Sequence, residues 1–162
     1  ACGAGAGRAQ GPQEGQKVIM ALTRSAVETV VTRRVGSLLE EAGLSAAAPN
    51  PHLADPIAWA LRGLGYNVAS ITDVTDADLL PVGAAHVDAL LDLAELRALE
   101  SVAGNLLAVD VEVGPVSEKR SSLGEHVTGL IADRRKGAQA RWGSILAQPL
   151  EETGGPVRLL AL

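Results

Sequence analysis

The stretch AHVDALLDLAELRALESV, residues 85–102, decides the fold of this chain. It contains no glycine or proline, and its apolar residues recur at the three- and four-residue spacing of a helix face. One apolar stripe consists of Val87, Leu90, Leu91, Ala94, Ala98 and Val102, and a second consists of Leu93, Leu96, Leu99, Ala103 and Leu106. A helix that is apolar over so much of its circumference is buried from more than one side. The sequence therefore predicts a central helix over residues 84–105, within an all-α bundle of about four helices.

The same helix carries an acidic ridge, which we define as Asp88, Asp92 and Glu95. No Lys or Arg of the helix lies on this ridge, so like charges face one another at helical spacing, which is mildly unfavourable in an isolated helix. Two interpretations stay open. The ridge is either a solvated face or a contact surface for a basic partner.

Beyond the central helix, Val109, Val111 and Val113 alternate with acidic residues and are followed by Gly114-Pro115. This period of two predicts a short extended, β-like segment over residues 109–113. A lone strand leaves its backbone groups unpaired, so we expect it to pair with another extended loop or with a neighbouring subunit. The three valines are therefore candidate partner-binding residues.

A further helix is predicted from Ser121 or Ser122 to Trp142, with Glu125 at capping-box spacing from Ser122. Its last turns carry a basic cluster: Arg134, Arg135, Lys136 and Arg141. Cations are favoured near a helix C-terminus, which explains the cluster as solvent-facing charge. The alternative is a docking patch, which makes Arg134, Arg135 and Lys136 candidate partner-binding residues.

Residues 143–162 read as a C-terminal extension that is interrupted by glycine and proline and has an apolar tip. The apolar residues of this tip are Val157, Leu159, Leu160 and Leu162. An exposed apolar end usually docks on something, so we expect a docking arm, with simple fraying as the alternative.

Toward the N-terminus, a helix is predicted from a capping box at Ser25 and Glu28 to a stop at Gly43-Leu44. Asp55-Pro56 predicts the start of a second, short helix over Ile57–Leu64, which Gly63 and Gly65 end. A third capping motif lies at residues 74–79 and is soon followed by Pro81. The helical domain is thus expected over residues 20–142.

Residues 1–19 form a Gly/Ala-rich and polar tail without periodicity. Met20 is the only methionine, and recognisable helix signals begin directly after it. We expect Met20 to be the natural start and residues 1–19 to be an over-extended reading. The alternative is a natural tail that a partner orders. The glycine run at residues 3–7 lacks the Gly-Lys-Ser/Thr of a phosphate-binding loop.

The composition excludes several classes of function. The single cysteine, Cys2, excludes an internal disulfide and a multi-cysteine zinc site. No apolar run approaches the length of a membrane span, and no signal peptide is recognisable, so we expect a soluble protein without membrane partners. Residues 61–120 hold ten acidic and four basic side chains, whereas residues 121–162 hold four acidic and five basic ones. DNA-binding proteins usually present a dominant basic face instead.

No catalytic constellation is visible, so we expect neither an enzyme nor a cofactor. The three histidines, His52, His86 and His126, have no second ligand at metal-binding spacing. Asp73, Asp76 and Asp78 could be read as metal ligands, but helix capping accounts for them better. Trp59 is expected to be a core residue rather than a ligand-stacking one.

Residues 53–142 resemble the head–tail connector proteins of long-tailed bacteriophages, also called adaptor or head-completion proteins. The resemblance is carried by LRGLGY at 61–66, VTDADL at 74–79, VDALLDLAELRALE at 87–100 and VGPVSEK at 113–119. It implies a helical subunit that forms a twelve-membered ring between the portal and the tail, made in the host bacterial cytoplasm and located in the virion. Its partners would be itself, the portal protein and the next connector or tail-terminator protein.

The resemblance also implies that DNA passes through the lumen of the ring without sequence-specific binding, which suits an acidic middle region. The C-terminal extension would then reach the portal. Two other function classes remain open. One is a small helical nucleic-acid-binding or regulatory module that uses the basic residues between Arg134 and Arg141. The other is an enzyme or ligand-binding helical domain centred on Trp59 or on the carboxylates between Asp73 and Asp78.

Overall fold

A computed structural model describes residues 21–70, 73–108 and 117–150. The described residues form five α-helices: α1 (Arg24–Glu41), α2 (Ala54–Gly63), α3 (Asp76–Leu79), α4 (Val87–Ala108) and α5 (Ser117–Trp142). Two short 3₁₀ turns, Pro51–Leu53 and Ala84–His86, lead into α2 and α4. No strand occurs in these ranges, which confirms the all-α prediction for the described part of the chain.

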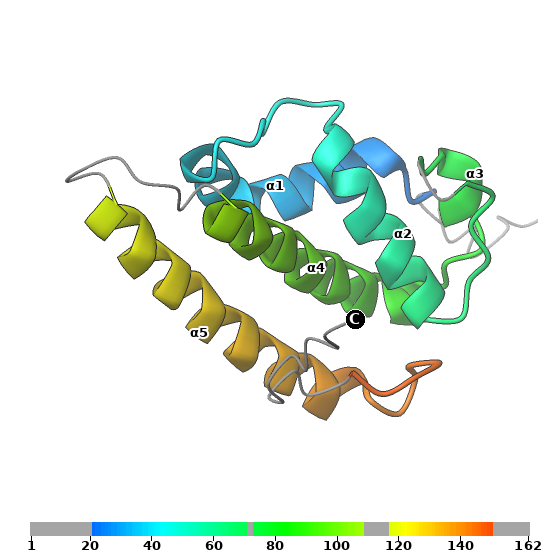
Figure 1. Ribbon diagram of the computed structural model, residues 1–162. Helices are drawn as coiled ribbons and strands as arrows, with labels where there is room; N and C mark the ends of the chain where they lie inside the picture. The colour runs from blue at the N-terminus through cyan, green and yellow to red at the C-terminus, as the bar shows by residue number, and fades with distance from the viewer. Residues whose placement is uncertain (1–20, 71–72, 109–116, 151–162) are drawn as a thin grey trace, which may run out of the picture.

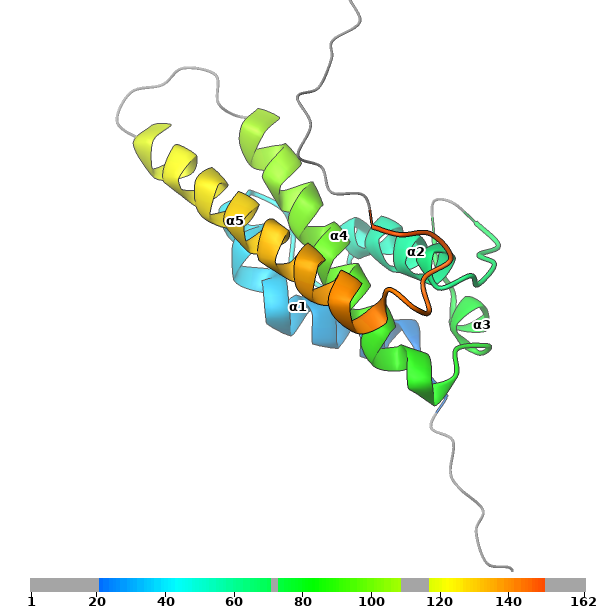
Figure 2. The ribbon, with the colours of Figure 1, turned by 90° about the horizontal axis from the view of Figure 1, so that it is seen from below.

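Helix α4 is the spine of the bundle (Figure 1). Helices α1, α2 and α5 each pack against it, with α5 on one side and α1 and α2 on the other. Viewed from below, α5 runs across α4 at a shallow angle (Figure 2). The prediction that the central helix is covered from more than one side is confirmed.

The core is built from leucines, valines and alanines, as a chain without phenylalanine requires. Leu90, Leu93, Leu96 and Leu99 of α4 are fully buried. Alanines contribute to the same core: Ala54, Ala58, Ala60, Ala89, Ala94 and Ala98 are all buried. Trp59, expected in the core, is only half-buried and packs at its edge.

The predicted end of α1 is confirmed, but its start lies two residues earlier than expected. Gly43 has a positive φ of 77°, and the Leu44 N–H donates to the Leu39 carbonyl at 2.8 Å, as the Gly-Leu stop predicts. At the other end the N-cap is Thr23, whose side chain accepts from the Ala26 N–H. Glu28 is not a capping residue. It lies inside α1 and is buried.

The predicted N-terminal cap of α2 is wrong, whereas that of α3 is confirmed. Asp55 is not the N-cap of α2, because the preceding 3₁₀ turn runs directly into the helix and moves its start to Ala54. The capping box of α3 is confirmed, since Thr75 and Asp78 bind each other's backbone groups. The structure thereby supports the capping interpretation for Asp78.

The two long helices also begin at slightly different residues than predicted. Helix α4 covers Val87–Ala108 rather than residues 84–105, and α5 begins at Ser117 rather than at Ser121 or Ser122. The end of α5 at Trp142 is as predicted. The N-terminal tail at residues 1–19, the extended segment at 109–113 and the tip at Val157–Leu162 lie outside the described residues.

None of the helices in the described ranges combines the length and the apolar character needed to cross a bilayer.

Candidate interaction surface

Two residues of the acidic ridge of α4, Asp92 and Glu95, are bound by arginines of the same chain, whereas Asp88 is exposed. Arg34 of α1 donates to Asp92 and to Glu95, each at 3.0 Å. From α5, Arg134 lies 3.0 Å from Glu95 and Arg141 lies 3.2 Å from Asp92. Asp92 and Glu95 therefore form a seam that joins three helices. The basic partner that the sequence left open is supplied by α1 and α5.

The seam is partly removed from water, which strengthens these contacts. The Glu95 side chain is only 6% exposed, whereas Arg34 and Arg134 remain 36% and 50% exposed. Burial works to lower the pKa of Arg34, but hydrogen bonds to Glu95 and Asp92 outweigh it, so that the pKa is raised. The Trp142 indole also donates to Asp92 at 2.9 Å, which fixes the end of α5 on α4.

A second set of charges links α2, α4 and α5 on another side of the spine. Arg97 of α4 donates to Asp55 of α2 at 3.2 Å and to Glu100 at 3.1 Å. Arg135 of α5 also pairs with Glu100. The Arg97 guanidinium lies 6.0 Å from the centre of the Trp59 ring, within the range of a cation–π contact.

The residues of the predicted basic cluster differ in whether they are paired. Arg134, Arg135 and Arg141 each bind a carboxylate of α4. Lys136 is exposed and makes no hydrogen bond or ion pair with the described residues. The sequence could not reveal the pairing, because the acidic ridge and the basic cluster lie about forty residues apart and meet only when α5 packs on α4.

The described part of the C-terminal extension, residues 143–150, returns from the end of α5 to the end of α2. The Ala147 N–H donates to the Gly63 carbonyl at 2.8 Å, and the Leu150 N–H donates to the Gln139 side chain at 3.0 Å. We call residues 143–150 the strap. Ile145, Leu146 and Leu150 of the strap pack against the core, so this part of the extension belongs to the helical body.

A groove of about 460 Å³ lies beside the strap. Trp59 and Arg62 of α2, Leu93 of α4, Arg135 of α5 and residues 146–150 line it. Arg62 is exposed and has no hydrogen-bond or ion-pair partner among the described residues. The lining of the groove therefore combines apolar residues, the Arg135–Glu100 ion pair and the exposed cation of Arg62.

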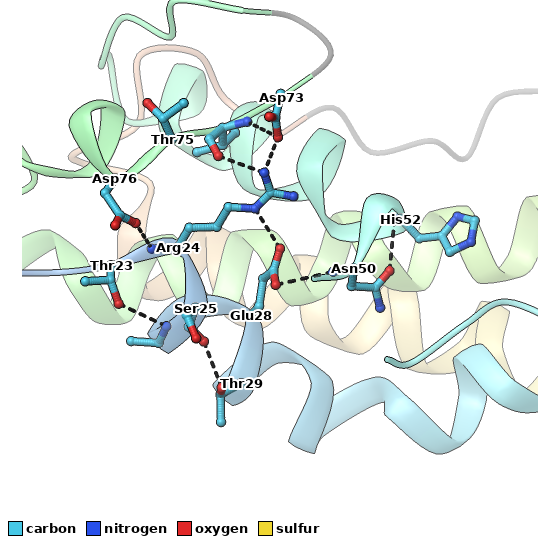
Figure 3. Close-up of polar contacts among 12 residues, drawn as sticks. Thr23, Arg24, Ser25, Glu28, Thr29, Asn50, His52, Asp73, Thr75 and Asp76 are labelled. Carbon is cyan, nitrogen blue, oxygen red and sulfur yellow. Dashed lines mark hydrogen bonds and ion pairs between the residues drawn. The ribbon is translucent and has the colours of Figure 1, made fainter. Parts of the chain in front are cut away.

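A third polar cluster ties the start of α1 to the segment before α3 (Figure 3). The Arg24 side chain donates to Glu28 at 2.7 Å and to the Val74 carbonyl at 2.9 Å, and it also pairs with Asp73. Its backbone N–H donates to Asp76 at 2.7 Å. Glu28 in turn accepts from the Asn50 N–H at 3.3 Å. Asp73 and Asp76 therefore serve as partners of Arg24.

The histidines are dispersed, as their spacing in the sequence indicates. Tyr66 and His86 share a hydrogen bond of 2.7 Å between the hydroxyl and Nδ1, whereas His52 and His126 are exposed. Among the described residues no group of three or more His, Cys, Asp or Glu side chains is placed to hold a metal ion. Every buried side-chain nitrogen or oxygen in the same ranges has a hydrogen-bond partner.

Comparison of the chain with protein-family models, with curated proteins and with solved structures finds no match.

Proposed function

We propose that this chain is a structural subunit of the head–tail connector of a long-tailed bacteriophage. In this role it assembles into a ring below the portal and lines the channel through which DNA leaves the head. The observation that carries the proposal is the resemblance over residues 53–142, together with the place of these residues in the fold. They include all of α2, α3, α4 and α5, and α4 is the helix on which the others pack.

The internal ion pairs support a role as a building block. The single residue Asp92 of α4 is contacted by Arg34 of α1 and by Arg141 and Trp142 of α5. These contacts hold the three helices in one arrangement. A subunit that keeps its shape loses less conformational freedom when it joins an assembly. The candidate contact residues Val109, Val111, Val113, Val157, Leu159, Leu160 and Leu162 remain proposals for the surfaces that meet neighbouring subunits and the portal.

The charge pattern also suits a channel that DNA must cross without adhering. Affinity for DNA rests mainly on free Lys and Arg side chains that displace counterions from phosphates. In this chain Arg134, Arg135 and Arg141 already bind carboxylates of α4. The same pairing gives no support to the alternative of a nucleic-acid-binding or regulatory module built on this cluster.

Native mass spectrometry tests the proposal directly. We expect the purified chain to form a ring, or to form a stoichiometric complex when it is mixed with a candidate portal protein. A chain that stays monomeric and does not bind the portal protein would contradict the connector function. In that case DNA binding as a function of salt concentration becomes the next measurement, since a binder that neutralises several phosphates loses affinity steeply as salt rises.

Deletion of Pro156–Leu162 tests the role of the C-terminal tip. The described helices end before this segment, so we expect the circular dichroism spectrum to keep the helical content of the full chain. Incorporation into the portal complex should be lost. Unchanged incorporation would show that the tip is not a docking arm.

A further inference from the structure

The groove beside the strap is lined by both apolar and charged side chains. Leu93 at its base is already fully buried by the helices. Trp59, Leu146 and Leu150 at its sides are only half-buried, so further apolar cover would remove more of their surface from water. Arg62 adds a positive charge at the rim. The groove thus suits an apolar segment with acidic residues close by.

The chain itself leads into this groove. The strap is fixed at Ala147 and again at Leu150, and Leu150 is both a wall of the groove and the last described residue. Glu151 and Glu152 follow immediately in the sequence, and the hexapeptide VRLLAL, which is apolar except for Arg158, occupies residues 157–162. The acidic pair therefore lies within two residues of Leu150 in the sequence, and Leu150 lines the same groove as Arg62.

The linker between the strap and the hexapeptide is short and contains a turn signal. Residues 151–156 are EETGGP, and Gly-Gly-Pro favours a reversal of chain direction. Six residues span at most about 20 Å when fully extended. A segment on so short a tether has an effective concentration in the millimolar range near its attachment point, which favours the groove of its own chain over that of another copy.

We propose that Val157–Leu162 docks in the groove of its own chain, against Trp59 and Leu150, with Glu151 and Glu152 beside Arg62. The C-terminal tip then covers the groove of the isolated subunit. This inference rests on the groove, the strap and the sequence that follows it. It holds whether or not the chain is a connector subunit.

Paramagnetic relaxation in solution tests the docking on the full chain. A nitroxide is attached at Ala161→Cys in a Cys2→Ser background, and signals are compared before and after reduction of the nitroxide. We expect the Trp59 indole N–H and the Gly63 and Ala147 amides to lose most of their intensity. A second sample mixes two chains: one carries the nitroxide but no ¹⁵N, and the other carries ¹⁵N but no nitroxide. In this mixture the same signals should keep their intensity.

Two outcomes overturn the proposal. Absence of any loss at these signals means that the tip does not reach the groove. An equal loss in the mixed sample means that the tip docks on a second copy instead. Neither outcome decides whether the chain forms a ring with a portal, so the two proposals fail separately.

Variants of the docking contacts provide the matched controls. Leu159→Asp/Leu160→Asp in the nitroxide-bearing chain should restore the Trp59 signal, and Arg62→Glu should restore it in part. Arg33→Glu is the control for Arg62→Glu, because Arg33 is exposed on α1 and does not line the groove. If Arg62→Glu and Arg33→Glu have the same effect, Arg62 does not contribute to the docking.

Discussion

Arg24 links the start of α1 to the segment before α3, and its substitution should lower the free energy of unfolding. In Arg24→Met, the Glu28 carboxylate, which is 4% exposed, stays buried without its guanidinium. Loss of one partner from a buried ion pair costs about 3 kcal/mol, and we expect that loss in the free energy of unfolding by urea. The double variant Arg24→Met/Glu28→Leu should recover most of it, because both charges are then gone.

Arg33→Met is the matched control for this pair. Arg33 is exposed on the same helix, and its substitution should change the free energy of unfolding by no more than about 0.5 kcal/mol. Equal effects of Arg24→Met and Arg33→Met would mean that the Arg24 cluster does not stabilise the fold.

Asp78 makes stability depend on pH in the acid range. Hydrogen bonds from the Ala69 N–H, the Thr75 N–H and the Thr75 hydroxyl lower the pKa of Asp78. A carboxyl with a lowered folded-state pKa contributes stability that is complete above its ordinary pKa of about 3.9 and disappears as the pH falls through the folded value. Asp78→Asn should therefore be less stable than the natural chain at neutral pH, and the difference should shrink below about pH 4.

Urea unfolding at a series of pH values measures this difference. Asp133→Asn is the control, since Asp133 is exposed in the middle of α5 and its variant should track the natural chain at every pH. A difference between Asp78→Asn and the natural chain that stays constant down to the lowest pH would contradict the assigned role of the Asp78 carboxylate.

The ion pairs of the seam between α4 and α5 should stabilise the packing of α5 on α4. Glu95 is shared by Arg34 and Arg134, so Glu95→Gln leaves two guanidiniums without their common carboxylate. Only two α5 side chains, Val127 and Ala138, are classed as buried apolar residues in the described ranges. We therefore expect faster amide hydrogen exchange throughout α5, with little change in α2.

Hydrogen exchange with mass spectrometric detection separates the two helices. Glu41→Gln at the exposed end of α1 is the control and should leave exchange in both helices unchanged. If Glu95→Gln accelerates exchange equally in α2 and α5, the variant weakens the whole fold and the seam does not act locally.

The helices themselves were largely predictable, because their signals are local. The Gly43-Leu44 stop and the Thr75–Asp78 box need only neighbouring residues, and both are confirmed. Ser25 and Glu28 show the limit of such signals. Their spacing satisfies a capping box, but Thr23 caps the helix, and Glu28 is turned inward to Arg24 and Asn50.

The candidate surface was less predictable, because it depends on contacts between distant segments. The sequence shows an acidic ridge at residues 88–95 and a basic cluster at 134–141, but each alone is equally consistent with solvent exposure. Their pairing follows from the packing of α5 on α4. The groove likewise arises only where the strap meets the end of α2 at Gly63.

A core without phenylalanine depends on close approach between helices, and this sets the cost of changing its small residues. Ala94 on α4 is fully buried, so Ala94→Leu must displace its neighbours, at a cost of about 1–3 kcal/mol. Leu99→Ala removes buried side-chain volume from the same helix and should cost about 2–5 kcal/mol. Ala132→Leu, at an exposed position of α5, should be nearly neutral. Urea unfolding ranks the three variants by their free energy of unfolding. If Ala94→Leu is as stable as Ala132→Leu, the helices around α4 are more loosely packed than the buried alanines indicate.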